Sequence, residues 1–226
     1  KIAQFGGAGY DDAVDIVLDK NQIPYVLVTL DNKASYAVYK GDPVTFKFTK
    51  LSLNPFLNSN PKALSVDSMG NIYILSEYRK QSVFVYKYSS SGANLSNLPV
   101  SGTPNVKAFD LRIDNDNIYV SYGLPNPENI FTGMIKKYTN FSTELWEVNL
   151  GLNYTANTLK IAGDALYLGG AYGGQNFIAR YTTAGKKVWS DTFSTPTATG
   201  SESVEGLATA AQINAVFPPG YGYAGS

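Results

Sequence analysis

The sequence contains no cysteine and no histidine among its 226 residues. Without cysteine the chain has no disulfide framework, no thiolate nucleophile and no thiolate metal site. Without histidine it also lacks the most common general base and zinc ligand. These two absences exclude whole classes of catalytic and zinc chemistry.

Charge and long apolar runs are also scarce. Charged residues make up 16% of the chain and the formal net charge is +0, which argues against a partner held by electrostatics, such as a nucleic acid or an anionic membrane. No apolar run approaches the roughly 18 to 20 residues that a membrane-spanning helix needs. We therefore expect a protein that is not transmembrane and does not bind nucleic acid.

Several features favour export. The composition is polar but weakly charged, and the chain begins at Lys1 without an initiator Met, as a processed or trimmed chain would. Three Asn-x-Ser/Thr sequons are candidate glycosylation sites; they begin at Asn94, Asn140 and Asn153. We expect an extracellular or cell-surface glycoprotein.

What the chain does contain is a repeat. The segments NIYI at 71–74, NIYV at 117–120 and ALYL at 165–168 lie in similar surroundings, with less obvious copies near both ends. A marker residue in the five copies recurs at intervals of 46 to 48 residues: Tyr25, Tyr73, Tyr119, Tyr167 and Asn214. Self-similarity at this period is typical of a repeat architecture.

Each repeat reads as four short strands. In the first strand apolar and polar residues alternate up to an Asp, as in AVDIVLD. A turn rich in Asp, Asn and Gly then leads to the second strand, which carries the marker residue. Third strands are predicted at SYAVYK, SVFVYKY, GMIKKY and NFIARY, and fourth strands at VTFKF from Val44, ANLSNL from Ala93, TELWEV from Thr143 and KKVWSDTF from Lys186. No segment keeps a helical apolar period over 10 residues.

Four antiparallel strands in every period are what a β-propeller blade requires, because radial packing buries both faces of each sheet. We predict an all-β chain that forms one β-propeller domain of four-stranded antiparallel blades. The predicted blades are at about 12–52, 61–100, 104–150, 156–195 and 203–226, the last completed by residues 1–7. This N-terminal strand would close a ring of five blades and remove an open sheet edge. The alternative is a piece of a longer propeller or of a multidomain surface protein.

Two segments resemble a known family. The stretch FGGAGYDDAVDIVLDKNQIPYVLV at 5–28 resembles the units of the bacterial and archaeal β-propeller repeat family, and YTTAGKKVW at 181–189 is similar to the outer hairpin of that family and of quinoprotein-type propeller repeats. The resemblance implies the fold and leaves function open, since these repeats occur in exported proteins of many kinds. Only two units carry the tryptophan of the quinoprotein docking motif, at Trp146 and Trp189, and nothing identifies a quinone site.

Three carboxylates are candidates for the mouth of the central channel. Equivalent positions near the start of the five first strands hold Asp15, Ala63, Asp110, Thr158 and Glu205. Asp15, Asp110 and Glu205 could catalyse glycoside hydrolysis, which needs paired carboxylates. They could instead be structural and accept hydrogen bonds from N–H groups of their own loops. A third alternative is that they bind a hard cation such as Ca²⁺.

Tyrosines in the loops between second and third strands are candidate binding residues. They are Tyr78, Tyr122, Tyr172 and Tyr221. An exposed tyrosine can stack on a sugar or a peptide, although a loop tyrosine can also fold back onto its own blade. We expect a non-catalytic module that binds a protein or glycan partner, or has a structural role, at the cell surface, without a required metal or cofactor. The alternative is a polysaccharide-active hydrolase or lyase.

Overall fold

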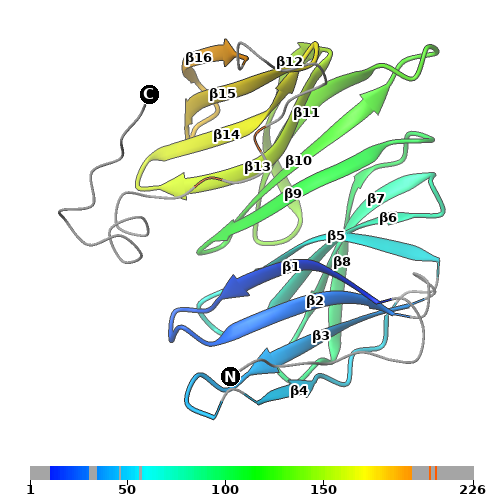
Figure 1. The fold of residues 1–226 in the computed structure, drawn as a ribbon, viewed down its shortest axis with the longest axis vertical. Coiled ribbons are helices and arrows are strands. Elements are labelled where there is room, and N and C mark those ends of the chain that lie inside the picture. The colour runs from blue at the N-terminus through cyan, green and yellow to red at the C-terminus, as the bar shows by residue number, and fades with distance from the viewer. Residues whose placement is uncertain are drawn as a thin grey trace.

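The computed structural model describes residues 11–30, 35–45, 47–55 and 58–194, together with Val204 and Leu207. These residues form four sheets of four antiparallel strands, in which each strand pairs with the next one in sequence (Figure 1). The prediction of an all-β propeller with four-stranded blades is confirmed. The predicted closing strand at 1–7 and all of the predicted fifth blade except Val204 and Leu207 lie outside the described residues.

The sheets are called blades 1 to 4 in chain order. Blade 1 contains β1 (Asp12–Leu18), β2 (Pro24–Leu30), β3 (Ser35–Gly41) and β4 (Phe48–Lys50), and blade 2 contains β5 (Ser59–Val66), β6 (Ile72–Tyr78), β7 (Ser82–Tyr88) and β8 (Asn94–Ser101). Blade 3 contains β9 (Lys107–Asp114), β10 (Asn117–Pro125), β11 (Phe131–Thr139) and β12 (Thr143–Leu152), and blade 4 contains β13 (Tyr154–Ala162), β14 (Ala165–Tyr172), β15 (Gln175–Thr182) and β16 (Lys187–Phe193).

The first strands of successive blades pack side by side. Strand β1 contacts β5, β5 contacts β9, and β9 contacts β13, and Figure 1 shows the blades following one another from the blue sheet to the yellow and orange sheet. Apolar residues fill each junction. Leu27 and Ile74 belong to the cluster between blades 1 and 2, Val85 to that between blades 2 and 3, and Ile135 and Leu168 to that between blades 3 and 4. The core is thus divided into layers between sheets.

The repeated marker tyrosine has a structural cause. Each marker lies in the second strand of its blade, directly opposite a basic residue of the third strand. The cation lies over the ring in all four blades, at 5.3 Å for Lys40 and Tyr25, 5.2 Å for Lys87 and Tyr73, 5.1 Å for Lys137 and Tyr119, and 6.0 Å for Arg180 and Tyr167. Such cation–π contacts contribute about 0.5 to 2 kcal/mol each.

The predicted fourth strand of blade 1 is wrong in position. Val44 and Thr45 lie in a turn, and the strand is the shorter β4 at Phe48–Lys50. The reason is local, because the carboxylate of Asp42 accepts the N–H groups of Val44 and Thr45 at 2.8 and 2.9 Å. An aspartate that bonds to its own backbone in this way stabilises a turn instead of a strand.

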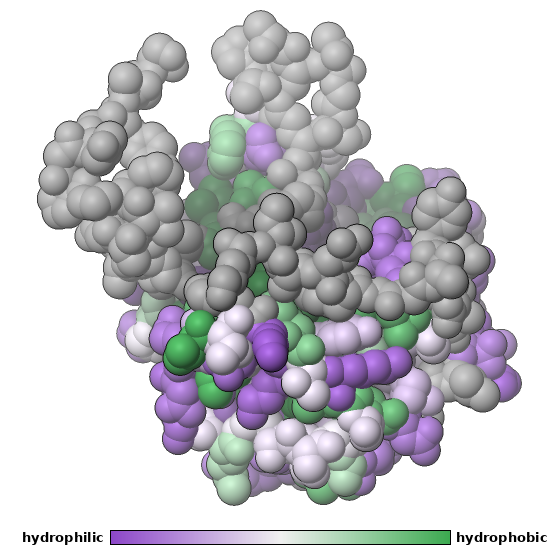
Figure 2. Space-filling model, turned by 60° about the horizontal axis from the view of Figure 1, so that its bottom comes forward, coloured by the Kyte–Doolittle hydropathy of each residue, from purple (hydrophilic) through white to green (hydrophobic). Residues whose placement is uncertain are grey.

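The face shown in Figure 2 has no large patch of one kind of residue among its described residues. In the described part of the face shown in Figure 2, hydrophilic and hydrophobic residues are interspersed. Within the described ranges no helix has the length and apolar character needed to cross a membrane. A functional site must therefore be sought in local geometry.

Blades 3 and 4 approach each other so closely at Gly133 that a side chain there would not fit. A Cβ atom at this position would lie 2.7 Å from the backbone oxygen of Tyr154, the first residue of blade 4. Gly133→Ala should lower the free energy of unfolding by roughly 1 to 3 kcal/mol, as overpacking does, in urea denaturation. Gly102→Ala is the matched control, since nothing lies within 4 Å of its Cβ. Equal stability of the two variants would contradict this packing.

Candidate functional site

A cavity of about 230 Å³ lies where the four first strands meet. Each first strand contains a β-bulge, in which one residue has no partner in the neighbouring second strand. The bulge residues Val14, Lys62, Phe109 and Asn157 line the cavity together with Asp15, Asp110, Thr158 and Arg112. Because a bulge bends the strand and changes the direction of its side chains, consecutive residues of three of the strands reach the same cavity.

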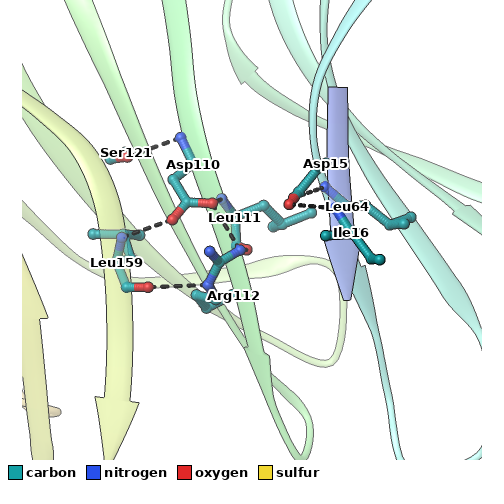
Figure 3. A network of polar contacts seen from close by, with 8 residues as sticks. All are labelled: Asp15, Ile16, Leu64, Asp110, Leu111, Arg112, Ser121 and Leu159. Atoms are coloured by element: carbon teal, nitrogen blue, oxygen red, sulfur yellow. Dashed lines mark hydrogen bonds and ion pairs between the residues drawn. The ribbon is translucent and has the colours of Figure 1, made fainter. Parts of the chain in front are cut away.

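Asp15 connects blade 1 to blade 2. Its Oδ2 atom accepts a hydrogen bond from the N–H of Leu64 in β5 at 2.8 Å, and its Oδ1 atom accepts the N–H of Ile16 at 2.8 Å (Figure 3). One carboxylate therefore pairs with a backbone donor of its own strand and with one from the next blade. Hydrogen bonds to an ionised acceptor are stronger than neutral ones.

Asp110 repeats this arrangement between blades 3 and 4. Its Oδ2 atom accepts the N–H of Leu159 in β13 at 2.7 Å, and its Oδ1 atom accepts the N–H of Leu111 at 2.7 Å. Arg112 forms an ion pair with the Oδ1 atom at 2.8 Å, and its Nε donates to the carbonyl of Leu159 at 3.0 Å (Figure 3). Asp110 and Arg112 together bind both the N–H and the C=O of one residue in the neighbouring blade.

Glu77 makes the corresponding contact between blades 2 and 3. Blade 2 has Ala63 where blades 1 and 3 have aspartates, and the buried Glu77 at the end of β6 accepts the N–H of Ala108 in β9 at 3.0 Å. Its other oxygen lies 3.5 Å from Lys62 Nζ. Glu77 was not among the predicted carboxylates, because it lies in a second strand, outside the aligned first-strand positions.

Burial controls the ionisation of the two aspartates. It raises the pKa of Asp110 to about 6, although Arg112 and the N–H groups of Leu159 and Leu111 lower it. It also raises the pKa of Asp15, against the lowering effects of the Leu64 N–H and the Arg112 guanidinium. In both cases the loss of hydration outweighs the favourable contacts of the charged form.

The structure brings together two of the three predicted carboxylates. Asp15 and Asp110 line one cavity, whereas Glu205 lies outside the described residues. Both aspartates bond to strand N–H groups, and not to their own loops as the structural alternative expected. The first strand is the edge strand of each sheet, and its N–H groups on the open side need an acceptor from elsewhere. Among the described residues, no three acidic side chains come together to hold a metal ion.

The candidate tyrosines differ sharply in exposure. Tyr172 is 38% exposed and stacks on Tyr154, with ring centres 4.2 Å apart. Tyr78 is half-buried and packs edge-on against Phe84 at 6.3 Å. Tyr221 lies outside the described residues.

Tyr122 does not present the exposed ring that a binding role requires. Its side chain belongs to the core between blades 2 and 3 and is 2% exposed. Its hydroxyl donates to Glu147 at 2.7 Å, and Lys136 lies over its ring at 5.9 Å. These polar partners stabilise the buried hydroxyl, so the ring cannot stack on a ligand from solution.

All three sequon asparagines are exposed. Asn94 is the first residue of the outer strand β8, whereas Asn140 and Asn153 lie in turns with positive φ angles of 51° and 66°. Each side chain therefore has access to solvent, as attachment of a bulky glycan requires.

Comparison with known proteins supports the fold. No protein-family model matches the chain, and no curated protein matches its sequence. Among solved structures, it is similar to hydrazine synthase of Kuenenia stuttgartiensis, with a TM-score of 0.58 and 15% identity over 80% of this chain and 49% of that chain. It is also similar to a protein of unknown function from Bacteroides caccae, with a TM-score of 0.56 and 14% identity over 83% of this chain and 69% of that one.

A third similar structure is the Dos1 propeller, with a TM-score of 0.57 and 11% identity over 82% of this chain and 48% of that one. The chain thus spans about half the length of the Dos1 propeller and of the hydrazine synthase chain. At these identities the likeness concerns the fold alone, and it defines the chain as a β-propeller protein.

Removing the Asp110 carboxylate should destabilise the protein. Asp110→Ala leaves the N–H groups of Leu111 and Leu159 without their acceptor, and we expect a loss of roughly 1 to 3 kcal/mol in the free energy of unfolding. Asp191 is the matched control, because it accepts the N–H of Thr192 in the same local way on an exposed strand. Asp191→Ala should change stability by less than about 0.5 kcal/mol. Equal losses in chemical denaturation would show that the cross-blade bond contributes nothing.

The raised pKa of Asp110 also predicts a pH dependence. Burial raises the pKa of Asp110 to about 6 in the folded state, whereas the usual aspartate value is 3.8. The protonated carboxyl therefore stabilises the folded state fully below about pH 4, and this contribution is lost as the pH rises through about 6. Relative to Asp110→Asn, the wild type should lose on the order of 3 kcal/mol over this range. Urea denaturation between pH 4 and pH 7 measures the difference. A wild type that instead gains stability relative to Asp110→Asn as the pH rises would mean that Arg112 holds the carboxylate ionised.

Proposed function

We propose that this protein is an exported, non-catalytic β-propeller that acts as a binding or structural module of a cell-surface or extracellular assembly. The observation that carries the proposal is that the carboxylates near the channel are occupied by hydrogen bonds to the backbone. Asp15 and Asp110 each engage both oxygens with backbone N–H groups, one of them in the next blade. Residues in this role hold neighbouring blades together and are poorly placed to exchange protons with a substrate.

An aromatic platform supports the binding role. Tyr172 is exposed, and its ring is fixed by stacking on Tyr154, which in turn packs edge-on against Phe177 with ring centres 4.9 Å apart. A ring that is already held in place loses little conformational entropy when a partner stacks on it. Tyrosine presents apolar area with a polar tip, which suits a glycan or a protein segment.

Three sequence features support export and a surface location. The sequons at Asn94, Asn140 and Asn153 are all exposed, and the composition has 16% charged residues and no cysteine. The segments at 5–28 and 181–189 resemble repeats of exported propellers.

Mass spectrometry of natively purified protein should therefore find a glycan on at least one of the three asparagines.

The binding role is tested with polysaccharides. In affinity electrophoresis through gels containing arabinan, xylan or a mixed host-glycan preparation, we expect at least one polymer to retard the wild type. Tyr172→Ala should weaken this retardation roughly threefold to tenfold, the value of one aromatic contact. Val188→Ala is the control, since Val188 is similarly exposed at 47% but lies on the outer strand β16. Retardation that survives Tyr172→Ala would exclude this platform.

A second candidate function is polysaccharide hydrolysis. It is favoured by the shared cavity of Asp15 and Asp110 and by the raised pKa of Asp110, about 6, which suits a general acid. Release of reducing sugar from the same polymers, lost in Asp110→Asn while the fold is retained, would replace the binding proposal with this one.

A further inference from the structure

The central cavity contains cations as well as the two aspartates. Asp15 and Asp110 each bind backbone N–H groups with both carboxylate oxygens. Lys62 and Arg112 line the same cavity from blades 2 and 3. The carboxylates are therefore committed to contacts between blades, whereas the two cations keep hydrogen-bond donors for other groups.

Arg112 uses only part of its guanidinium group. Its Nε atom donates to the carbonyl of Leu159 at 3.0 Å, and its Nη1 atom donates to the carbonyl of Leu111 at 2.7 Å and pairs with Asp110 at 2.8 Å (Figure 3). An arginine carries five N–H donors in a planar fork. Because the bonds of Arg112 to described residues involve Nε and Nη1, the Nη2 atom keeps its N–H groups for a ligand.

Lys62 is the bulge residue of β5 and reaches the cavity from blade 2. Its ion pair with Glu77 is long, at 3.5 Å, and 31% of the lysine side chain is exposed. Glu77 has two other donors, since it accepts the N–H of Ala108 at 3.0 Å and the side-chain amide of Asn60 at 3.2 Å. An ammonium group has three N–H donors, so Lys62 can bind a ligand while Glu77 stays in place.

A third cation, Lys160, lies close to Arg112. The two residues hold equivalent positions, because each is paired with the marker tyrosine of its own blade. Burial and, after it, the nearby Arg112 guanidinium lower the pKa of Lys160. Among the described acidic side chains, none forms an ion pair with Lys160. Like charges repel each other, and an anion bound beside them would relieve the repulsion.

We propose that the central cavity binds a small hydroxylated carboxylate, of the size of one uronic acid ring, and that Lys62 and Arg112 hold its carboxylate group. Hydrogen bonds between charged partners are about twice as strong as neutral ones. Asn157 and Thr158 line the blade 4 side of the cavity, and their side chains both donate and accept, which suits the hydroxyl groups of a sugar.

The size of the cavity limits the ligand to a single small molecule. Its volume is about 230 Å³, which is below the roughly 300 to 1,000 Å³ of pockets for drug-sized ligands. The inference goes beyond the proposed function and does not depend on it, because Tyr172 does not line this cavity.

Binding of an anion here should be coupled to protons. The charged side chains around the cavity balance when all are ionised, with three negative and three positive groups: Asp15, Glu77 and Asp110, and Lys62, Arg112 and Lys160. Burial raises the pKa of Asp110 to about 6 and also raises the pKa of Asp15. Positive charge therefore exceeds negative charge below about pH 6, and the affinity for a carboxylate should fall as the pH rises through this value.

Isothermal titration calorimetry of the 226-residue chain with D-galacturonate tests the proposal. At pH 5.5 and low salt we expect a dissociation constant on the order of 1 mM, and D-galactose, its neutral counterpart, should bind at least about tenfold more weakly. Lys62→Gln should weaken galacturonate binding by about tenfold or more, because it removes a charged donor. Lys187→Gln is the matched control, since Lys187 is an exposed lysine on the outer strand β16, and it should bind like the wild type.

Four results would overturn the proposal. They are the absence of binding heat with galacturonate, equal affinity for galactose, affinity unchanged in Lys62→Gln, and an affinity that rises between pH 5.5 and pH 7.5. Sodium sulfate is a further probe, because a cavity that binds sulfate as tightly as galacturonate is a general oxyanion site without preference for a hydroxylated carboxylate. Thr158→Val should weaken galacturonate binding and leave sulfate binding unchanged, since it removes only a hydroxyl group.

Discussion

The structure depends on hydrogen bonds that cross from one blade to the next near the channel. Each first strand is the edge strand of its sheet, so its N–H groups that face away from the second strand have no partner in that sheet. An unpaired buried N–H costs about as much as a lost hydrogen bond, so each junction needs an acceptor from elsewhere. Asp15, Glu77 and Asp110 supply it at the three described junctions.

These inner contacts act together with the packing of the outer hairpins. Near the channel, a carboxylate fixes the neighbouring first strand. At the rim, the hairpin turns of blades 3 and 4 pack on aromatic and basic residues of the preceding blade. Apolar clusters fill the layer between the two. Because the contacts lie both near the central cavity and at the outer edge of the blades, they restrict the angle between neighbouring blades as well as the distance between them.

The same arrangement explains why the acidic residues resemble a catalytic site. A carboxylate beside the central cavity must be buried to reach the next blade, and burial raises its pKa. A raised pKa in a concave site is therefore produced by the architecture itself. The hydrogen bonds favour the structural interpretation, since Asp110 pairs both oxygens with backbone donors and one also with Arg112.

The sequence by itself determined the period, the four strands of each described repeat and the propeller class, because these follow from alternation, turn residues and repetition along the chain. The opposition of Tyr73 and Lys87 was also contained in it, as a local hairpin register. Only the tertiary structure decided which groups meet across blades. Asp15 bonds to Leu64, 49 residues away, and Glu77 replaces the carboxylate that Ala63 lacks. Tyr122 is buried while Tyr172 is exposed, since burial depends on how neighbouring sheets pack and not on the strand that carries the residue.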